Sequence, residues 1–176
     1  CFDLNLPVVV GTTGWHESAG VVKKWCIDER QAIFVATNFS VGVNILYRLT
    51  ERLSKLMNPL DDYEISLEEI HHIHKLDAPS GTAIRLAEII LGGVGRKKQW
   101  VNYPQASLEE LQILSVRENE IPGIHKIICE SDSDKLTIKH TAKGRKGFAV
   151  GAVLAAEWMA GKKGYLGMKD LLHFPE

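Results

Sequence analysis

The pattern at the start of the chain alternates between short apolar runs and one amphipathic segment. Residues 7–14 contain three consecutive valines followed by a turn with two glycines, and residues 32–37 form a second apolar run. Because polar side chains do not interrupt either run, both are typical of strands buried on both faces of a parallel sheet. Residues 16–30 between them have helical spacing. Four of their side chains share one face: Val21, Val22, Trp25 and Cys26. The order strand, helix, strand predicts a βαβ unit.

A longer amphipathic segment follows at residues 41–57. Ser40 precedes it as a candidate N-cap, and Asn58-Pro59 ends it, because a residue before proline resists the helical conformation. Its apolar side chains recur every three or four residues, which predicts a helix with one buried stripe. The predicted stripe consists of Val41, Ile45, Leu49, Leu53, Leu56 and Met57.

The middle of the chain predicts a strand, a helix and a loop. Apolar and polar residues alternate at 63–68, which indicates a half-buried strand. A glycine-containing turn at residues 79–82 leads into a helix at residues 82–91. Residues 95–110 have the composition of an exposed loop.

The last part of the chain predicts three more strands and a closing helix. The strands are expected at residues 111–117, 123–130 and 134–141, and a turn at residues 131–134 joins the last two as a hairpin. The helix, at residues 147–160, is rich in alanine and glycine, which favours close packing on a sheet. Its larger side chains form one stripe: Val150, Leu154 and Trp158.

Composition and charge exclude several classes of protein. The 176 residues carry a formal net charge of -1, so no attraction to nucleic acid or to a membrane surface is expected. No apolar run approaches the ~20 residues that a membrane-spanning helix needs. The three cysteines are widely spaced along the chain, at positions 1, 26 and 129. This spacing argues against a disulfide framework or a cysteine zinc site and fits a reducing, cytoplasmic location.

Residues 68–83 concentrate the groups that can perform chemistry. Three histidines and one lysine lie within five residues: His71, His72, His74 and Lys75. Histidine exchanges protons near neutral pH, and a lysine beside other cationic groups is a candidate proton donor. Residues 79–82 lead into a helix whose first amides can bind an anion, and Gly81 allows close approach. The segment predicts a pocket for a small carboxylate with proton-transfer groups beside it.

Two other interpretations of this segment stay open. In the first, the histidines have only a structural role. In the second, His72 and His74 share one face of a strand and bind a metal ion, although the cationic Lys75 disfavours a divalent ion. The Ser80-Gly81-Thr82 run is not a phosphate loop, because the Gly-Lys-Ser/Thr ending is absent.

Residues 71–83 resemble the signature of the dihydrodipicolinate reductase family. That signature runs His-His-x-x-Lys-x-Asp-x-Pro-Ser-Gly-Thr-Ala, and every fixed position is matched. Residues 11–14 resemble the family's loop beside the nicotinamide, and residues 36–42 resemble its second cofactor loop and hinge. Residues 146–152 resemble the start of its C-terminal helix. The resemblance covers nearly the whole chain.

The resemblance implies roles for individual residues. His71 and Lys75 would be the catalytic proton-transfer groups, and His72, Gly81 and Thr82 would bind the substrate. No metal site is implied. The residues that would line the nicotinamide side of the cofactor site are Gly11, Thr12, Thr13, Ala36, Thr37, Asn38 and Phe39.

The resemblance also implies a fold and a reaction. The fold would be α/β, with residues 1–39 and 144–176 forming part of a Rossmann dinucleotide-binding domain. Residues 40–143 would form an α+β substrate-binding and oligomerisation domain with a mixed open sheet, assembled as a homo-tetramer. The reaction would be NADPH- or NADH-dependent reduction of dihydrodipicolinate, formed from 4-hydroxy-tetrahydrodipicolinate, to tetrahydrodipicolinate. This step belongs to lysine and diaminopimelate biosynthesis, and the substrate is a small dicarboxylate.

The sequence departs from the family at its front. Family members open with a strand, a G-x-G-x-x-G turn and a helix, a pattern that is not found at a strand–helix junction here. We therefore expect an N-terminally truncated chain that binds the cofactor weakly. The alternative function is a non-catalytic fragment that binds a dicarboxylate or oligomerises. A different dehydrogenase is disfavoured, because neither Cys26 nor Cys129 has the setting of a catalytic cysteine.

Overall fold

The computed structural model describes residues 1–174, without the side chain of His16. The chain divides into two compact units: residues 1–44 with 146–176, and residues 45–145. Within the described residues, no helix is both long and apolar enough to cross a lipid bilayer. The thiols of Cys1, Cys26 and Cys129 are free.

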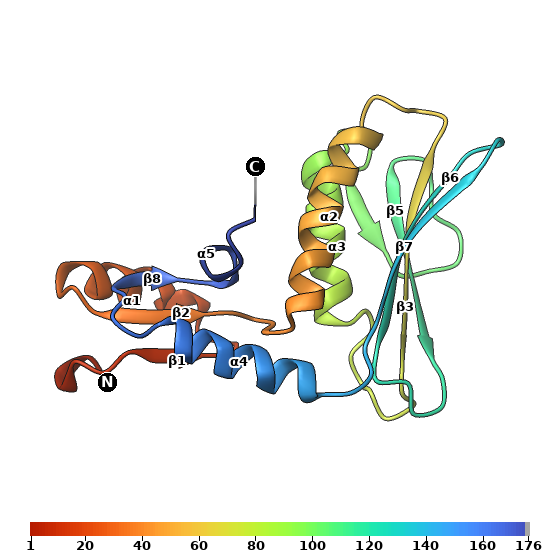
Figure 1. Ribbon diagram of the computed structural model, residues 1–176. Coiled ribbons are helices and arrows are strands. Elements are labelled where there is room, and N and C mark those ends of the chain that lie inside the picture. The colour runs from red at the N-terminus through yellow and green to blue at the C-terminus, as the bar shows by residue number, and fades with distance from the viewer. Residues whose placement is uncertain (175–176) are drawn as a thin grey trace. The chain divides into compact units, whose positions relative to one another are not determined.

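The first unit contains a three-stranded parallel sheet in the order β1-β2-β8 (Figure 1). Its strands are β1 (Val8–Val10), β2 (Ala32–Val35) and β8 (Gly164–Leu166). The helix α1 (His16–Asp28) connects β1 to β2, which pair in parallel, so the predicted βαβ unit is confirmed. A short 3₁₀ helix, Phe2–Leu4, precedes β1. The strand β8 and the helix α5 (Met168–Leu172) carry too few residues to show a period, and the sequence analysis did not anticipate either.

The apolar face predicted for α1 is only partly buried. Cys26 is fully buried, but Val21 is 71% exposed and Trp25 is 48% exposed. The ring of Trp25 instead packs edge-on against Phe2, with 5.0 Å between centroids. The buried stripe of α1 is therefore narrower than the spacing of its four apolar side chains predicted.

The helix α4 (Lys146–Trp158) packs closely, as its small residues predict. Gly151 and Ala155 form its buried face, whereas Val150 and Leu154 of the predicted stripe are exposed. A Cβ added to Gly151 would lie 1.8 Å from the carbonyl oxygen of Phe39. The smallest residues thus mark the contact surface of this helix.

The second unit is built on a five-stranded mixed sheet in the order β4-β5-β3-β6-β7. Its strands are β3 (Glu64–His71), β4 (Gln99–Val101), β5 (Glu110–Arg117), β6 (Ile124–Glu130) and β7 (Lys135–Thr141). The first three run parallel to one another, and β6 and β7 form the predicted antiparallel hairpin. The strand β4 at one edge corrects the expectation that residues 95–110 are an exposed loop throughout. Its Trp100 and Val101 are withdrawn from solvent by pairing with β5.

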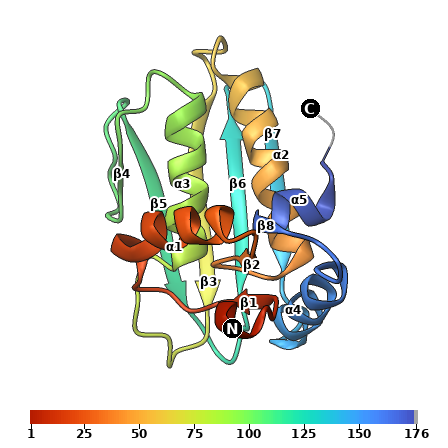
Figure 2. The same ribbon diagram turned by 90° about the vertical axis from the view of Figure 1, so that its left-hand side faces the viewer.

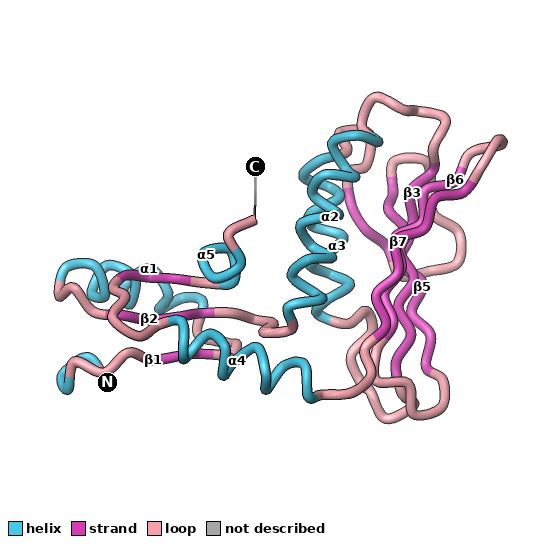
Figure 3. Tube along the Cα trace, in the orientation of Figure 1, coloured by secondary structure: helices cyan, strands magenta, loops and turns pink. Residues whose placement is uncertain are grey.

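Two helices cover one face of this sheet, and none of the helices described for this unit covers the other face (Figures 2 and 3). They are α2 (Val41–Met57) and α3 (Gly81–Gly93). The core between sheet and helices is formed by apolar side chains, including Leu46, Leu86, Ile90, Ile113 and Ile127. The bounds of α2 agree with the predicted residues 41–57.

The buried face of α2 differs from the predicted stripe. Ile45, Leu49 and Leu56 are exposed, while Thr50 and Ser54 are buried. The hydroxyls of Thr50 and Ser54 donate to the carbonyl oxygens four residues earlier, at 2.7 and 2.8 Å, so their burial leaves no donor unpaired. A Cβ on Gly93 of α3 would lie 2.6 Å from Ser54 Cβ. Close contact between two helices has therefore selected small side chains over large apolar ones.

Candidate active site

The pairing of β3 with its neighbours gathers ionisable side chains at one end of the sheet. Along β3, Glu69 and His71 follow Ile65 and Leu67 on the face covered by helices. Glu69 lies opposite His125 of β6, and His71 lies opposite Arg117 of β5. Three strands that are distant in sequence thus contribute to one cluster.

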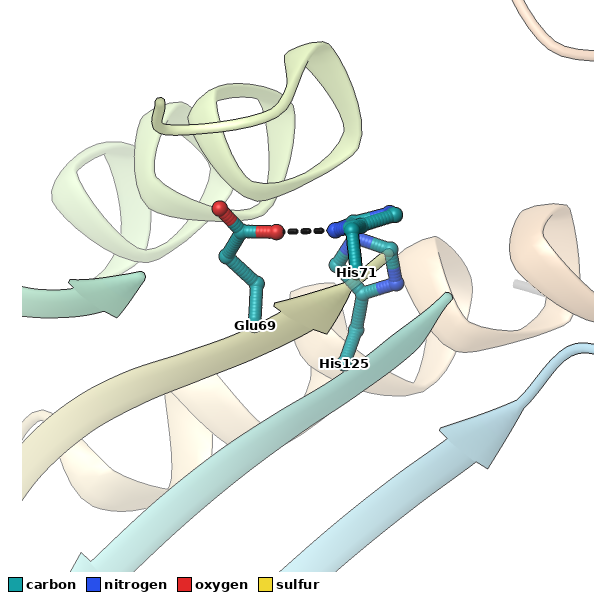
Figure 4. Close-up of side chains that lie close together, drawn as sticks. All are labelled: Glu69, His71 and His125. Carbon is teal, nitrogen blue, oxygen red and sulfur yellow. Dashed lines mark hydrogen bonds and ion pairs between the residues drawn. The ribbon is translucent and has the colours of Figure 1, made fainter. Parts of the chain in front are cut away.

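Glu69 and His71 form a buried hydrogen-bonded pair (Figure 4). The Nδ1 atom of His71 bonds to one carboxylate oxygen of Glu69, and Arg117 Nη1 donates to the other at 3.0 Å. The ring of His125 stands nearly perpendicular to that of His71, with 5.1 Å between centroids and 72° between planes. Glu69 is completely buried, His71 is 7% exposed and His125 is 5% exposed.

Burial and charge set the protonation of two members of this cluster. Burial alone would raise the pKa of the Glu69 carboxyl, but hydrogen bonds from groups that include His71 and Arg117 outweigh it and lower the pKa to about 2. Burial, with a smaller contribution from His71, lowers the pKa of His125 to about 4. At neutral pH Glu69 is therefore an anion and His125 is neutral.

Lys75 lies in a turn that follows β3. The backbone N–H of Lys75 donates to the carbonyl oxygen of His72 at 3.1 Å. Its Nζ atom donates to both carboxylate oxygens of Asp77, at 2.6 and 2.8 Å, and this hydrogen bond lowers the pKa of Asp77. Along the sequence, Lys75 lies close to histidines that can become cations. In the structure, its ammonium group instead bonds to the Asp77 carboxylate.

The helix α3 begins beside His125. Ser80 is its N-cap and accepts a hydrogen bond from the N–H of Ala83 at 3.2 Å. The Ser80 hydroxyl also bonds to His125 Nε2 at 3.1 Å. Gly81 is exposed, and a Cβ there would meet no atom within 4 Å, so the backbone of this first turn is open to a ligand. The amides at such a helix start favour an anion.

His72 and His74 lie in the turn after β3, not on one face of a strand as the alternative metal site required. The strand β3 ends at His71, and the two following rings lie 6.0 Å apart between centroids. His74 Nε2 bonds to Glu120 at 3.0 Å on the surface. Among the side chains that the structure describes, the donor atoms of Glu69, His71 and His125 lie within 4.8 Å of one another. Arg117 already pairs with that carboxylate, which disfavours a second cation there.

The predicted cofactor residues lie at the carboxyl ends of two neighbouring parallel strands. Gly11, Thr12 and Thr13 follow β1, and residues 36–39 follow β2. The N–H of Ala36 donates to Val10 at 3.1 Å, and a Cβ on Gly11 would lie 3.1 Å from the Phe39 ring, so the two loops are adjacent. The Phe39 ring itself is buried and stacks on Phe34, with 5.8 Å between centroids. Such strand ends are where parallel sheets place ligands.

Comparison with known proteins decides the family. Residues 42–172 match the family described as "Dihydrodipicolinate reductase, C-terminus". The chain belongs to the dihydrodipicolinate reductase family. The resemblance and the α/β fold class predicted from the sequence are thereby confirmed.

Relatives in this family carry the name that the sequence motif implied. A 4-hydroxy-tetrahydrodipicolinate reductase of Christiangramia forsetii is 46% identical over 172 residues, covering 98% of this chain and 72% of that protein. A 4-hydroxy-tetrahydrodipicolinate reductase of Neisseria gonorrhoeae is 36% identical, and the match covers 98% of this chain and 65% of that protein. These names agree with the predicted function.

A solved structure of the family resembles this chain over most of its length. It is a dipicolinate-bound dihydrodipicolinate reductase from Paenisporosarcina sp. TG-14, with a TM-score of 0.73 and 26% identity. The match covers 97% of this chain and 66% of that one. The chain thus spans about two thirds of the length of this dihydrodipicolinate reductase.

Four residues of this cluster have no assignment from the sequence alone. They are Glu69, Ser80 in its role as partner of His125, Arg117 and His125, the last of which was left without a role. A signal for two of them exists: Glu69 continues the buried alternation of Ile65 and Leu67, and His125 precedes the buried Ile127 by the same spacing. An ionisable residue on a buried face needs a partner, which points to a cluster.

Proposed function

We propose that this chain supplies the substrate-binding and proton-transfer groups of an NADPH- or NADH-dependent 4-hydroxy-tetrahydrodipicolinate reductase. The observation that carries the proposal is the adjacency of the His71 cluster and the start of α3, joined by the bond between His125 and Ser80. A dicarboxylate needs an anion site, and its reduction needs a proton donor nearby. The residues proposed for both roles lie within one unit of this chain.

The substrate site is assigned to the first turn of α3. Gly81 and Thr82 would bind one carboxylate through the helix amides and the threonine hydroxyl, and His72 would contact the same ligand. The dipicolinate bound to the similar structure is a planar dicarboxylate, which supports this class of ligand.

The reaction adds a hydride and a proton to the substrate ring. When bound, the nicotinamide cofactor supplies the hydride, which goes to ring carbon 4. The neighbouring carbon gains a proton, and His71 and Lys75 are the groups assigned to deliver it. A cationic donor suits this step, because it becomes neutral when the proton leaves and so places no negative charge beside a dicarboxylate.

The chain's own residues fit the nicotinamide side of such a cofactor. The exposed backbone of residues 11–13 and the half-buried Ala36 and Asn38 would line it, while the buried Phe39 would support the loop from below. We further propose a cytoplasmic homo-tetramer. The face of the five-stranded sheet that lacks helices is the surface through which copies would associate, as the family resemblance implies.

Calorimetry with pyridine-2,6-dicarboxylate tests the proposal. The chain should bind this ligand, and Thr82→Val should weaken binding about tenfold or more, because a hydrogen bond to a charged group contributes ~1.5–3 kcal/mol. Ser133→Ala, in the exposed turn between β6 and β7, is the control and should keep the original affinity. Equal affinity in all three proteins, or no binding by any, contradicts the proposal.

A further inference from the structure

Arg117 connects elements that otherwise have separate places in the sequence. Its Nη1 atom donates to Glu69 Oε1 at 3.0 Å and to the carbonyl oxygen of Val116 at 2.8 Å. Its Nε atom donates to the carbonyl oxygen of Lys75 at 3.2 Å, and its Nη2 atom donates to that of Asp77. One planar guanidinium thus holds the carboxylate bonded to His71 and the turn that carries Lys75.

The turn has little else to hold it. Leu76 is 97% exposed and Ile73 is 60% exposed, so apolar burial contributes little to its conformation. The N–H of Ile73 donates to the carbonyl oxygen of Asn119 at 3.1 Å, and this bond anchors the start of the turn. At the end of the turn, Arg117 of β5 bonds to the carbonyl oxygens of Lys75 and Asp77 and so ties them to the sheet.

Glu69 determines which nitrogen of His71 can act on a ligand. A carboxylate only accepts hydrogen bonds when ionised, so the bond to Nδ1 requires a proton on that atom. The neutral ring then carries its lone pair on Nε2, which is the atom that takes up a proton and, from the imidazolium, passes it to a ligand. A Cβ on Gly123 would lie 3.0 Å from that Nε2 atom, so a side chain at position 123 would crowd it.

We propose that Glu69 and Arg117 are positioning residues that hold His71 and Lys75 as one proton-transfer unit. Glu69 fixes the Nδ1–H tautomer of His71, and Arg117 holds both Glu69 and the backbone of Lys75. This inference rests on the proposed function for the roles of His71 and Lys75. The charged and titratable groups that lie around His71 and Lys75 are Glu69, Arg117, His125 and Asp77.

Nitrogen-15 NMR of the histidine side chains tests the first part without any substrate. In the unsubstituted chain, neutral His71 should show a protonated Nδ1 and an unprotonated Nε2. Glu69→Gln should reduce this single tautomer to a mixture, because an amide can either donate to or accept from Nδ1. Glu68→Gln is the matched control, since Glu68 pairs with Lys126 on the other face of β3 and should leave the tautomer unchanged. An Nε2–H tautomer in the unsubstituted chain, or the same tautomer in Glu69→Gln, overturns the proposal even if some variants fail to fold.

Kinetics of the intact enzyme test the role of Arg117. Arg117→Lys should lower kcat about tenfold to 10²-fold, because general acid catalysis contributes ~10²–10⁴-fold. The bonds of Arg117 to Glu69 and to two carbonyl oxygens of the turn use three different nitrogens, and lysine has only one. The affinity for pyridine-2,6-dicarboxylate should stay within about twofold, since Arg117 does not touch the start of α3. Arg85→Lys, in a surface pair with Glu88, is the control and should keep the original kcat.

Two outcomes separate this inference from the proposed function. An unchanged kcat in Arg117→Lys, or loss of dicarboxylate affinity in parallel with kcat, contradicts the positioning role. Failure of the unsubstituted protein to bind pyridine-2,6-dicarboxylate contradicts the proposed function instead, and the tautomer of His71 still decides whether Glu69 orients the ring.

Discussion

The covered face of β3 changes from apolar to ionisable within a few residues. Ile65 and Leu67 belong to the core, whereas Glu69 and His71 occupy the next two positions on the same face. A buried carboxylate is costly unless it is paired and hydrogen-bonded. The hydrogen bonds from His71 and Arg117 stabilise the buried Glu69 carboxylate and offset the free-energy cost of its burial. Removal of either partner would leave that buried charge without full compensation.

The two perturbed groups of this cluster predict a loss of stability in acid. His125 has a folded pKa of about 4, below its usual value of 6.5, so the unfolded chain binds the proton first and stability is lost as the pH falls from 6.5 towards 4. Glu69 has a folded pKa of about 2, below its usual 4.5, so its contribution is present above pH 4.5 and is lost towards pH 2. Of the two, His125 should act first on acidification.

The substitution His125→Gln measures how much His125 contributes to the pH dependence of the unfolding free energy. Between pH 7 and pH 4 the unsubstituted chain should lose about 3 kcal/mol of unfolding free energy through this residue, since each pKa unit corresponds to ~1.4 kcal/mol. In the variant, the unfolding free energy should fall by about 3 kcal/mol less between pH 7 and pH 4. Urea titrations at a series of pH values measure this difference. His74→Gln, a change of an exposed histidine, should retain the original pH dependence. An identical acid slope in both variants would show that the burial of His125 does not govern it.

The sequence alone shows only part of the site at this scale. The motif at residues 71–83 includes His71, Lys75 and the start of α3, because these groups are close along the chain. Arg117 and His125 come to the cluster through sheet register, which pairs them with His71 and Glu69 across separate strands. A local pattern contains no information about that register. The alternation along β6 places His125 on the buried face, but neither its partners nor the place of Arg117 follows from spacing.

At the scale of elements, the points of closest approach are set by small residues. Gly151 of α4 meets the backbone of Phe39, and Gly93 of α3 meets Ser54 of α2. For this reason helix bounds were predicted well and helix faces were not. The period of apolar residues gives the length of α2, but its contact surface contains Thr50 and Ser54, whose hydroxyls are satisfied within the helix.

A pair of glycine substitutions in α4 tests this description. Gly151→Ala should destabilise the protein by about 1–3 kcal/mol or more, because its Cβ would lie 1.8 Å from a backbone oxygen and the helix would have to shift. Gly147→Ala, where the Cβ would meet Ser40 Oγ at 3.8 Å, should be neutral or stabilise by up to about 1 kcal/mol, because alanine favours helix. Thermal unfolding of the two variants measures both effects. Similar melting temperatures in the two would contradict the close contact.

At the scale of the whole molecule, the helix-free face of the five-stranded sheet is a candidate surface for association. On the face without helices, β5 and β6 present Leu114, Val116, Ile124 and Ile128, of which Leu114 is 47% exposed. Charged and polar side chains of the same face, such as Glu68 and Lys126, pair across the strands. Such a mixed surface fits association with a second copy, in which apolar area is buried and polar groups set the register.

Substitution on this face tests the proposed tetramer. Sedimentation of the original chain should give about four times the chain mass of 19.6 kDa. Ile128→Glu should reduce the assembled mass, because a carboxylate would be buried without a partner at the interface. Leu108→Glu, at a position 82% exposed and outside the sheet, should leave the tetramer intact. A monomeric original chain would contradict the tetramer, and a tetramer that survives Ile128→Glu would place the interface elsewhere.

The division of the chain has a consequence for the timing of folding during synthesis. The second unit is continuous, so all five of its strands have emerged from the ribosome once residue 145 is free. The first unit is interrupted: β2 must wait for β8, its parallel neighbour, until the whole second unit has been made. Domains generally fold as units during synthesis. The site around His71 can therefore form while β2 still lacks β8 as its neighbour.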